Sequence, residues 1–214
     1  MIAIFDWDGT LCDSIDHIVE AMQDTAAELG LAPPSVMAVR DIVGLGLPQA
    51  ISQLFPALDD TQCGEVAAAY SRHFVAPGRA PAQLFDGALE TLEALRGRGI
   101  ELAVATGKSR RGLNRVLGTL GMEGYFDATR CVDETRSKPH PMMLQEIMVE
   151  RNKRAQEVVV IGDSEYDLDM ARQAGVRSVG VSFGVHDNAR LRGFEPLAIV
   201  DELPQLLAMD VFTL

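Results

Sequence analysis

The sequence predicts an α/β protein with a doubly wound parallel sheet and an all-helical segment inserted after the first strand. From residue 88 to residue 200, short apolar runs alternate with segments of helical spacing, the pattern of parallel strands joined by right-handed helical crossovers. Residues 13–81 show helical spacing only, so they form an insertion rather than a crossover. We therefore expect an α/β core domain of residues 1–12 and 82–214 and a small helical domain of residues 13–81.

The chain begins with the stretch that the rest of the molecule is organised around. Residues 2–5 form a short apolar run, typical of a strand buried on both faces. Asp6 and Asp8 follow at its carboxyl end, where ligands bind in open α/β sheets. In extended chain these two side chains project to one side. Gly9 allows a sharp exit, and the Thr10 hydroxyl can donate a hydrogen bond to a carboxylate.

This pair of acids predicts a cation site. Two adjacent carboxylates do not both ionise cheaply without a positive partner, and Mg²⁺ is the hard divalent cation that prefers oxygen ligands. A lone Asp-x-Asp is more often the end of a strand in a turn. Asp6-Trp7-Asp8-Gly9-Thr10 directly after an apolar amino-terminal strand favours the metal.

The insertion contains several expected helices. Apolar residues recur at helix spacing from Ile15 to Leu29, and Gly30 ends this segment. Pro48 suits a first helical turn, and Asp60-Thr61 is expected to cap the longest remaining helix. The further helices are expected at 35–41, 48–54 and 61–75, with no strand in the insertion and a Pro/Gly linker at 77–81.

The remainder alternates helices and strands. Gly99, Gly121 and Gly175 each follow a helical segment, and Ser109 is a good N-cap. The expected helices cover 88–98, 109–120, a segment after Pro141 ending near 152, and 165–174. The expected strands cover 102–105, 129–132, 158–161, 178–181 and a short sixth strand at 198–200.

Composition narrows the class of protein. The formal net charge of −12 argues against nucleic acid or an anionic membrane as a main partner. Cys12, Cys63 and Cys131 are scattered and lack metal-binding spacing, so we expect reduced thiols in a cytoplasmic protein. No apolar run is long enough for a membrane helix. Lys108, Lys138 and Lys153 are the only lysines among 19 basic residues. Because an ordinary surface position of this chain carries arginine, each lysine is a candidate for a specific role.

Polar residues occur at four places along the chain, each at the carboxyl end of an expected strand or in the loop after it. In addition to the first pair of acids, these are Thr106, Lys138, and Asp163 with Asp167. Each alone has an ordinary structural explanation, such as a strand-end hydroxyl, a surface lysine or an acid near a helix N-terminus. Their occurrence in order, with βα units between them, predicts that one crevice at the carboxyl edge of the sheet collects them.

These motifs resemble the haloacid dehalogenase superfamily in its phosphatase branch. They are Asp6-Trp7-Asp8-Gly9-Thr10, Thr106-Gly107-Lys108, Ser137-Lys138-Pro139 and Gly162-Asp163-Ser164-Glu165-Tyr166-Asp167. The resemblance implies a strand order of 3-2-1-4-5 and a mobile cap after the first strand. The uncharged turn Gly44-Leu45-Gly46-Leu47 is similar to the caps of phosphoglycolate phosphatases.

The resemblance also implies roles that agree with the chemistry of phosphoryl transfer. Asp6 is the expected nucleophile and Asp8 the acid and base. Thr106 and the Gly107 N–H are expected to hold phosphoryl oxygens, and Lys138 to neutralise charge. Mg²⁺ is expected to bind a carboxylate oxygen of Asp6, the backbone carbonyl of Asp8 and a carboxylate oxygen of Asp163, with Asp167 bound directly or through water.

Two alternatives remain open at this stage. A sugar-phosphate mutase of the same family usually carries an arginine just after the cap-loop glycine, where this chain has Leu45. A receiver-type signalling module also combines acids, a threonine and a lysine, but its phosphoacceptor follows the third strand. A small phosphorylated metabolite is the expected partner, and the sequence leaves the oligomeric state open.

Substrate recognition is expected in the insertion. It holds nine acidic residues and three arginines, which predicts a small phosphomonoester with at most one further anionic group. His17 and Arg40 are the candidate substrate contacts there.

Overall fold

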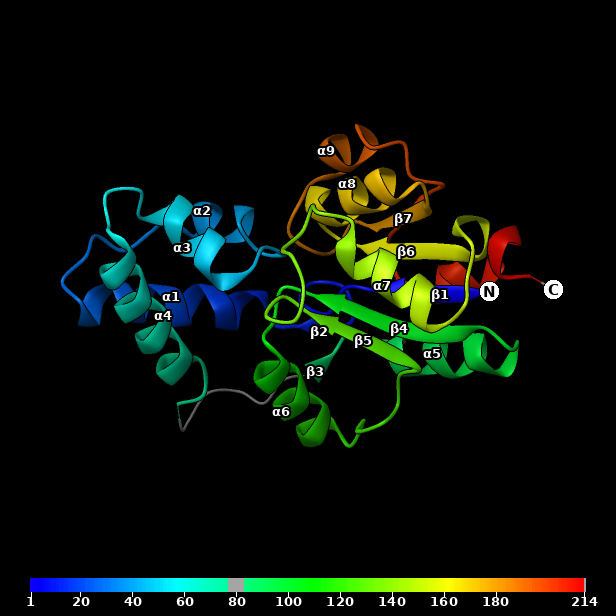
Figure 1. Ribbon diagram of the computed structural model, residues 1–214, viewed down its shortest axis with the longest axis horizontal. Coiled ribbons are helices and arrows are strands. Elements are labelled where there is room, and N and C mark those ends of the chain that lie inside the picture. Colours follow the sequence, from blue (N-terminus) through cyan, green and yellow to red (C-terminus); the bar gives the residue numbers. More distant parts are fainter. Residues whose placement is uncertain (77–82, 214) are drawn as a thin grey trace.

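A computed structural model describes residues 1–76 and 83–213, and its centre is a six-stranded parallel sheet (Figure 1). The strand order is β5-β4-β1-β6-β7-β8, so the first five strands have the predicted 3-2-1-4-5 order and β8 extends one edge. The strands are β1 (Ile2–Phe5), β4 (Glu101–Thr106), β5 (Ala128–Cys131), β6 (Val158–Gly162), β7 (Arg177–Val181) and β8 (Ile199–Val200).

The three central strands are buried on both faces, as their apolar runs predict. Along β1, Ile2 and Ile4 enter one hydrophobic cluster, while Ala3 and Phe5 enter another on the opposite face. β4 and β6 alternate in the same way because side chains of a strand point to opposite faces in turn. Ile4 pairs with Ala103 on one side and with Val160 on the other, which sets β1 in the middle of the sheet.

Helices cover both faces. The helices α5 (Ala88–Gly97) and α6 (Arg110–Leu120) pack on the face of Phe5, and α7 (Met142–Glu150) and α8 (Glu165–Ala174) on the face of Ile4 (Figure 1). The predicted ends of α6 and α8 are confirmed, since Gly121 and Gly175 both have a positive φ of 68°. The remaining short helices are α9 (Asn188–Arg192), η1 (Ala155–Glu157), η2 (Leu203–Ala208) and η3 (Asp210–Phe212).

Four helices form a separate group beside the sheet, here called the helical lobe (Figure 1). It has its own hydrophobic cluster, built from residues such as Ile18, Val39, Ile51 and Val66. The helices are α1 (Ile15–Glu28), α2 (Val36–Asp41), α3 (Leu47–Leu54) and α4 (Asp60–Phe74).

Two local predictions were wrong. Asp59, not the Asp60-Thr61 pair, caps α4, and it exchanges hydrogen bonds with Gln62 in a capping box. A two-stranded antiparallel ribbon of β2 (Cys12–Asp13) and β3 (Gln83–Leu84), which we did not expect, joins the two ends of the insertion, and its Asp13 lies in the segment where we expected no strand. Two-residue strands carry no periodicity, and their pairing joins distant parts of the chain. The predicted linker at 77–81, and with it the domain boundary between residues 81 and 82, lies outside the described residues.

All three cysteines are free thiols, in agreement with the prediction. Among the described helices, none combines the length and apolar character needed to cross a membrane.

The burial of the central sheet gives a matched test of packing. Val160→Ala, at a position that is 1% exposed, should lower the free energy of unfolding by about 2 kcal/mol through lost burial and a residual cavity. Val149→Ala, at a position on α7 that is 82% exposed, should change it by less than about 0.5 kcal/mol. Urea unfolding of both variants measures the difference, and equal values would contradict the assigned core.

Candidate active site

Three buried carboxylates meet at the carboxyl edge of the sheet. Asp6 follows β1, Asp163 follows the neighbouring strand β6, and Asp167 lies in the first turn of α8. One carboxylate oxygen of each lies within 4.8 Å of the others, and all three side chains are buried. Parallel pairing of β1 with β6 therefore brings together acids that are more than 150 positions apart in the chain.

Lys138 joins this cluster from the loop before α7. Its Nζ lies 2.6 Å from Asp6 Oδ1 and 2.6 Å from Asp167 Oδ1, and its side chain is fully buried. Burial alone would lower the pKa of Lys138, but the carboxylates of Asp167 and Asp6 raise it above its ordinary value. The lysine is therefore a fixed positive charge inside the acidic cluster. The Lys138–Pro139 peptide bond is cis.

One ammonium does not balance three carboxylates. Burial raises the pKa of Asp6 well above its usual range, against the opposing effect of Lys138. Burial, with a contribution from Asp167, raises the pKa of Asp163 to about 7. A hard divalent cation would relieve this excess of negative charge, and carboxylate oxygens are its preferred donors. The donor set in this cluster therefore fits Mg²⁺.

The acids are held by hydrogen bonds from their surroundings. Thr10 Oγ1 donates to Asp163 Oδ1 at 2.7 Å, and the Val185 N–H donates to Oδ2 at 2.9 Å. The predicted bond from Thr10 to a carboxylate thus exists, but its acceptor comes from the other strand. Gly9 has a φ of 81°, and a Cβ there would lie 2.3 Å from Asp163 Oδ2. Glycine is required at this position because the turn after β1 passes so close to the acid.

Asp167 is engaged on both oxygens. Its Oδ1 meets Lys138, and its Oδ2 accepts hydrogen bonds from the Ser164 N–H at 3.1 Å and the Ser164 hydroxyl at 2.6 Å. In this arrangement Asp167 orients the lysine.

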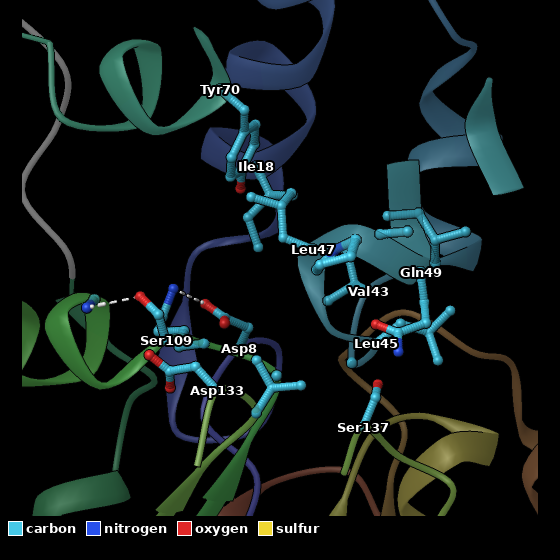
Figure 2. Close-up of a pocket in the computed structure, with 18 of the residues that line it drawn as sticks. Asp8, Ile18, Val43, Leu45, Leu47, Gln49, Tyr70, Ser109, Asp133 and Ser137 are labelled. Carbon is cyan, nitrogen blue, oxygen red and sulfur yellow. Dashed lines mark hydrogen bonds and ion pairs between the residues drawn. The ribbon is translucent and has the colours of Figure 1, made fainter. Parts of the chain in front are cut away.

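Asp8 lies apart from the three-acid cluster. Its Oδ1 forms an ion pair with Lys108 Nζ at 2.9 Å and accepts a hydrogen bond from the Ser14 hydroxyl at 2.5 Å. Figure 2 draws the ion pair as a dashed line at Asp8. Two partners thus hold this carboxylate beside the nucleophile candidate without adding it to the cluster, while the metal role predicted for Asp8 involves its backbone carbonyl.

Thr106 ends β4 and is buried, and its hydroxyl accepts a hydrogen bond from the Lys108 N–H at 3.1 Å. Gly107 lies directly under the helical lobe. A Cβ at this position would lie 2.5 Å from the Leu45 carbonyl oxygen and 2.8 Å from that of Gly44. The uncharged turn of the lobe therefore sits against the backbone that we expect to hold phosphoryl oxygens.

A cavity of about 920 Å³ lies between the helical lobe and the sheet edge. Figure 2 shows Ile18 and Tyr70 of the lobe on one side, and Asp8 and Ser137 of the α/β core on the other. The lobe supplies a mostly apolar wall with one charged residue, Arg72, which pairs with Glu28. The core supplies the other charged groups, including Asp6 and Lys138. This division suits a ligand whose charged end faces the sheet.

The two substrate contacts predicted in the insertion do not line this cavity. The His17 ring stacks on Phe74 with centroids 4.4 Å apart, and its Nε2 is 2.8 Å from the Phe74 carbonyl oxygen. Arg40 Nη2 donates to the Gly184 carbonyl oxygen at 2.7 Å, so it connects the lobe to the core.

The cavity contains cations that we did not expect there. Lys108 lines it, and so do Arg111, Arg115 and Arg136, all from the α/β core. The scarcity of lysine was a signal for Lys108. No feature of the sequence singled out the three arginines, because arginine is the usual basic residue of this chain. Their positions at the cavity become apparent only in the folded structure.

Comparison with known proteins agrees with this geometry. Residues 3–181 match the family model described as haloacid dehalogenase-like hydrolase. The chain is 35% identical to "Probable phosphatase IndB" of Dickeya dadantii, over 96% of this chain and 91% of that protein. It is 34% identical to phosphoglycolate phosphatase of Agrobacterium fabrum, over 96% and 90%. A crystal structure of a haloacid dehalogenase-like hydrolase from Bacteroides fragilis aligns with a TM-score of 0.89 at 27% identity, covering 96% and 98% of the two chains.

The buried ion pairs of Lys138 give a stability test. Lys138→Met should lower the free energy of unfolding by about 3–5 kcal/mol in chelator, because it leaves buried carboxylates without their positive partner. Lys153→Met is the matched control. Lys153 pairs with Glu101 at a partly exposed site, and its loss should cost at most about 1 kcal/mol. Denaturant unfolding of both variants measures this, and a neutral Lys138→Met would contradict the buried pairing.

Proposed function

This chain belongs to the haloacid dehalogenase-like hydrolases and is a phosphatase, and from that premise we propose that it hydrolyses a small phosphomonoester with Mg²⁺ through an aspartyl-phosphate on Asp6. The observation that carries the proposal is the buried cluster of Asp6, Asp163, Asp167 and Lys138 at the cavity. Such a cluster is costly to bury and needs a function to explain it.

In the first step, a carboxylate oxygen of Asp6 attacks phosphorus, and the bond from phosphorus to the leaving oxygen breaks. Asp8 donates a proton to that oxygen, so an alcohol leaves. In the second step, Asp8 takes a proton from water, and the resulting hydroxide oxygen attacks the aspartyl-phosphate. Inorganic phosphate leaves and the Asp6 carboxylate returns. The Lys108 and Ser14 contacts hold Asp8 in place for both transfers.

Three groups of the chain stabilise the transferred phosphoryl group. Lys138 supplies a permanent positive charge beside Asp6. The Thr106 hydroxyl and the Gly107 N–H would donate to phosphoryl oxygens. Mg²⁺, when bound by the carboxylates of Asp6 and Asp163 and the backbone carbonyl of Asp8, would neutralise further phosphoryl charge.

We also propose that residues 13–81 act as a cap domain over the site. The apolar wall of the cavity comes from this segment, and its turn at Gly44 and Leu45 lies against Gly107. Such a cover excludes water and strengthens electrostatic interactions beneath it. The names of the relatives favour hydrolysis over the mutase reaction that the sequence left open, and they make phosphoglycolate one substrate to test.

The reaction is tested by measuring phosphate release from a panel of phosphorylated metabolites. We expect repeated turnover with Mg²⁺ and loss of activity in chelator. Asp6→Asn should remain folded yet release no phosphate, because an amide is not a nucleophile here. Asp16→Asn, on the exposed face of α1, should keep wild-type activity. Turnover by Asp6→Asn would contradict the nucleophile, and full activity in chelator would contradict the metal.

Metal binding is tested without turnover. At 100 times its dissociation constant, Mg²⁺ should stabilise the wild-type fold by about 2.7 kcal/mol and raise its melting temperature. Asp163→Asn should abolish most of this shift because a buried anionic donor is lost, whereas Asp16→Asn should retain it. Calorimetry or thermal-shift fluorescence measures the effect, and an equal shift in Asp163→Asn would place the metal elsewhere.

A further inference from the structure

Two arginines at the cavity have no polar partner among the residues that the structure describes. Among the residues that the structure describes, nearly every lysine or arginine side chain meets a carboxylate, a carbonyl oxygen or a ring. Arg111, Arg115 and Arg192 are the exceptions in that part of the chain: their side chains make no hydrogen bond or ion pair. Arg111 and Arg115 both line the cavity, and Arg192 does not.

Their positions place them together. Arg111 and Arg115 are four residues apart on α6, so they lie on one side of that helix. The buried residues of α6, Leu113 and Leu117, anchor the opposite side in the core. The pair therefore faces the cavity as one cationic surface, and both side chains are exposed.

This placement is unfavourable for the folded protein alone. Like charges four residues apart on a helix repel, and a cation in the first turn opposes the helix dipole. α6 has no acid in its first turn. The neighbouring Arg110 is compensated by Glu134, but Arg111 is not. Residues that break such local rules are expected at functional sites, and an external anion would remove the conflict.

The acids that line the cavity are occupied elsewhere. Asp6 meets Lys138, and Asp8 meets Lys108 and Ser14. The remaining one, Asp133, accepts a hydrogen bond from the Arg110 N–H at 2.8 Å. No described acid of the cavity therefore pairs with Arg111 or Arg115, so both guanidinium groups are free to bind an anionic ligand.

We infer that Arg111 and Arg115 form a subsite for a second anionic group of the substrate, a carboxylate or a phosphate. The inference rests on the phosphatase function proposed above. Guanidinium groups bind both anions in bidentate geometry. A cavity of about 920 Å³ has room for more than one phosphoryl group, and the apolar wall of the lobe suits an uncharged spacer between the two anionic ends. In that case residues of the α/β core, as well as the helical lobe, select the substrate.

The test compares matched substrates of increasing chain length: n-alkyl phosphates, the same phosphates with a terminal carboxylate, and the corresponding terminal bisphosphates. The readout is the ratio of kcat/KM for the substrate with the second anion to kcat/KM for its neutral partner. The double variant Arg111→Gln/Arg115→Gln should lower this ratio about tenfold, the value of one strong charged hydrogen bond. Arg192→Gln, an unpaired arginine outside the cavity, should leave the ratio unchanged.

Binding of the same ligands to the Asp6→Asn variant, measured by calorimetry, separates the inference from the reaction. Weaker binding of the second anion after the double substitution supports the subsite even if no turnover occurs. Normal turnover with an unchanged ratio overturns the subsite and leaves the phosphatase intact. Carboxylate and bisphosphate series identify which anion the arginines prefer.

Discussion

The structure depends on the burial of Lys138 between Asp6 and Asp167. Three buried carboxylates within 4.8 Å of one another repel strongly, and among the described residues the ammonium of Lys138 is the one positive charge that reaches two of them. Even with the lysine, three ionised carboxylates leave two negative charges unbalanced. That residual negative charge is the physical basis of the proposed divalent cation site, because a bound Mg²⁺ would balance it.

The stability of the central sheet offsets the unfavourable free energy of bringing these charges together. β1 and its two neighbours are buried on both faces by separate hydrophobic clusters, so the strand ends that carry Asp6, Thr106 and Asp163 are rigidly placed. Serine and threonine hydroxyls then orient the acids from short range. Rigid strands and local hydrogen bonds together supply the preorganisation on which electrostatic catalysis depends.

The cavity separates two kinds of recognition. The helical lobe brings apolar side chains and little charge, whereas the core brings the acids, Lys138 and the α6 arginines. A protein with a net charge of −12 thereby presents a locally basic surface to an anionic ligand. The polar contacts predicted in the lobe point elsewhere: His17 packs on Phe74, and Arg40 connects the lobe to the loop at Gly184.

The sequence by itself determined the main strands, the helix ends at Gly121 and Gly175, and the acids that follow β1 and β6, while the strand order followed from the resemblance to a known family. Buried strands, capping residues and the motifs around Asp6 and Asp163 are local signals, each contained within a few residues. Tertiary structure decided what no local signal carries: the β2–β3 ribbon, the pairing of Asp8 with Lys108, and the meeting of Arg111 and Arg115 with the cavity. These contacts join segments far apart in the chain, and their partners are fixed only when the chain folds.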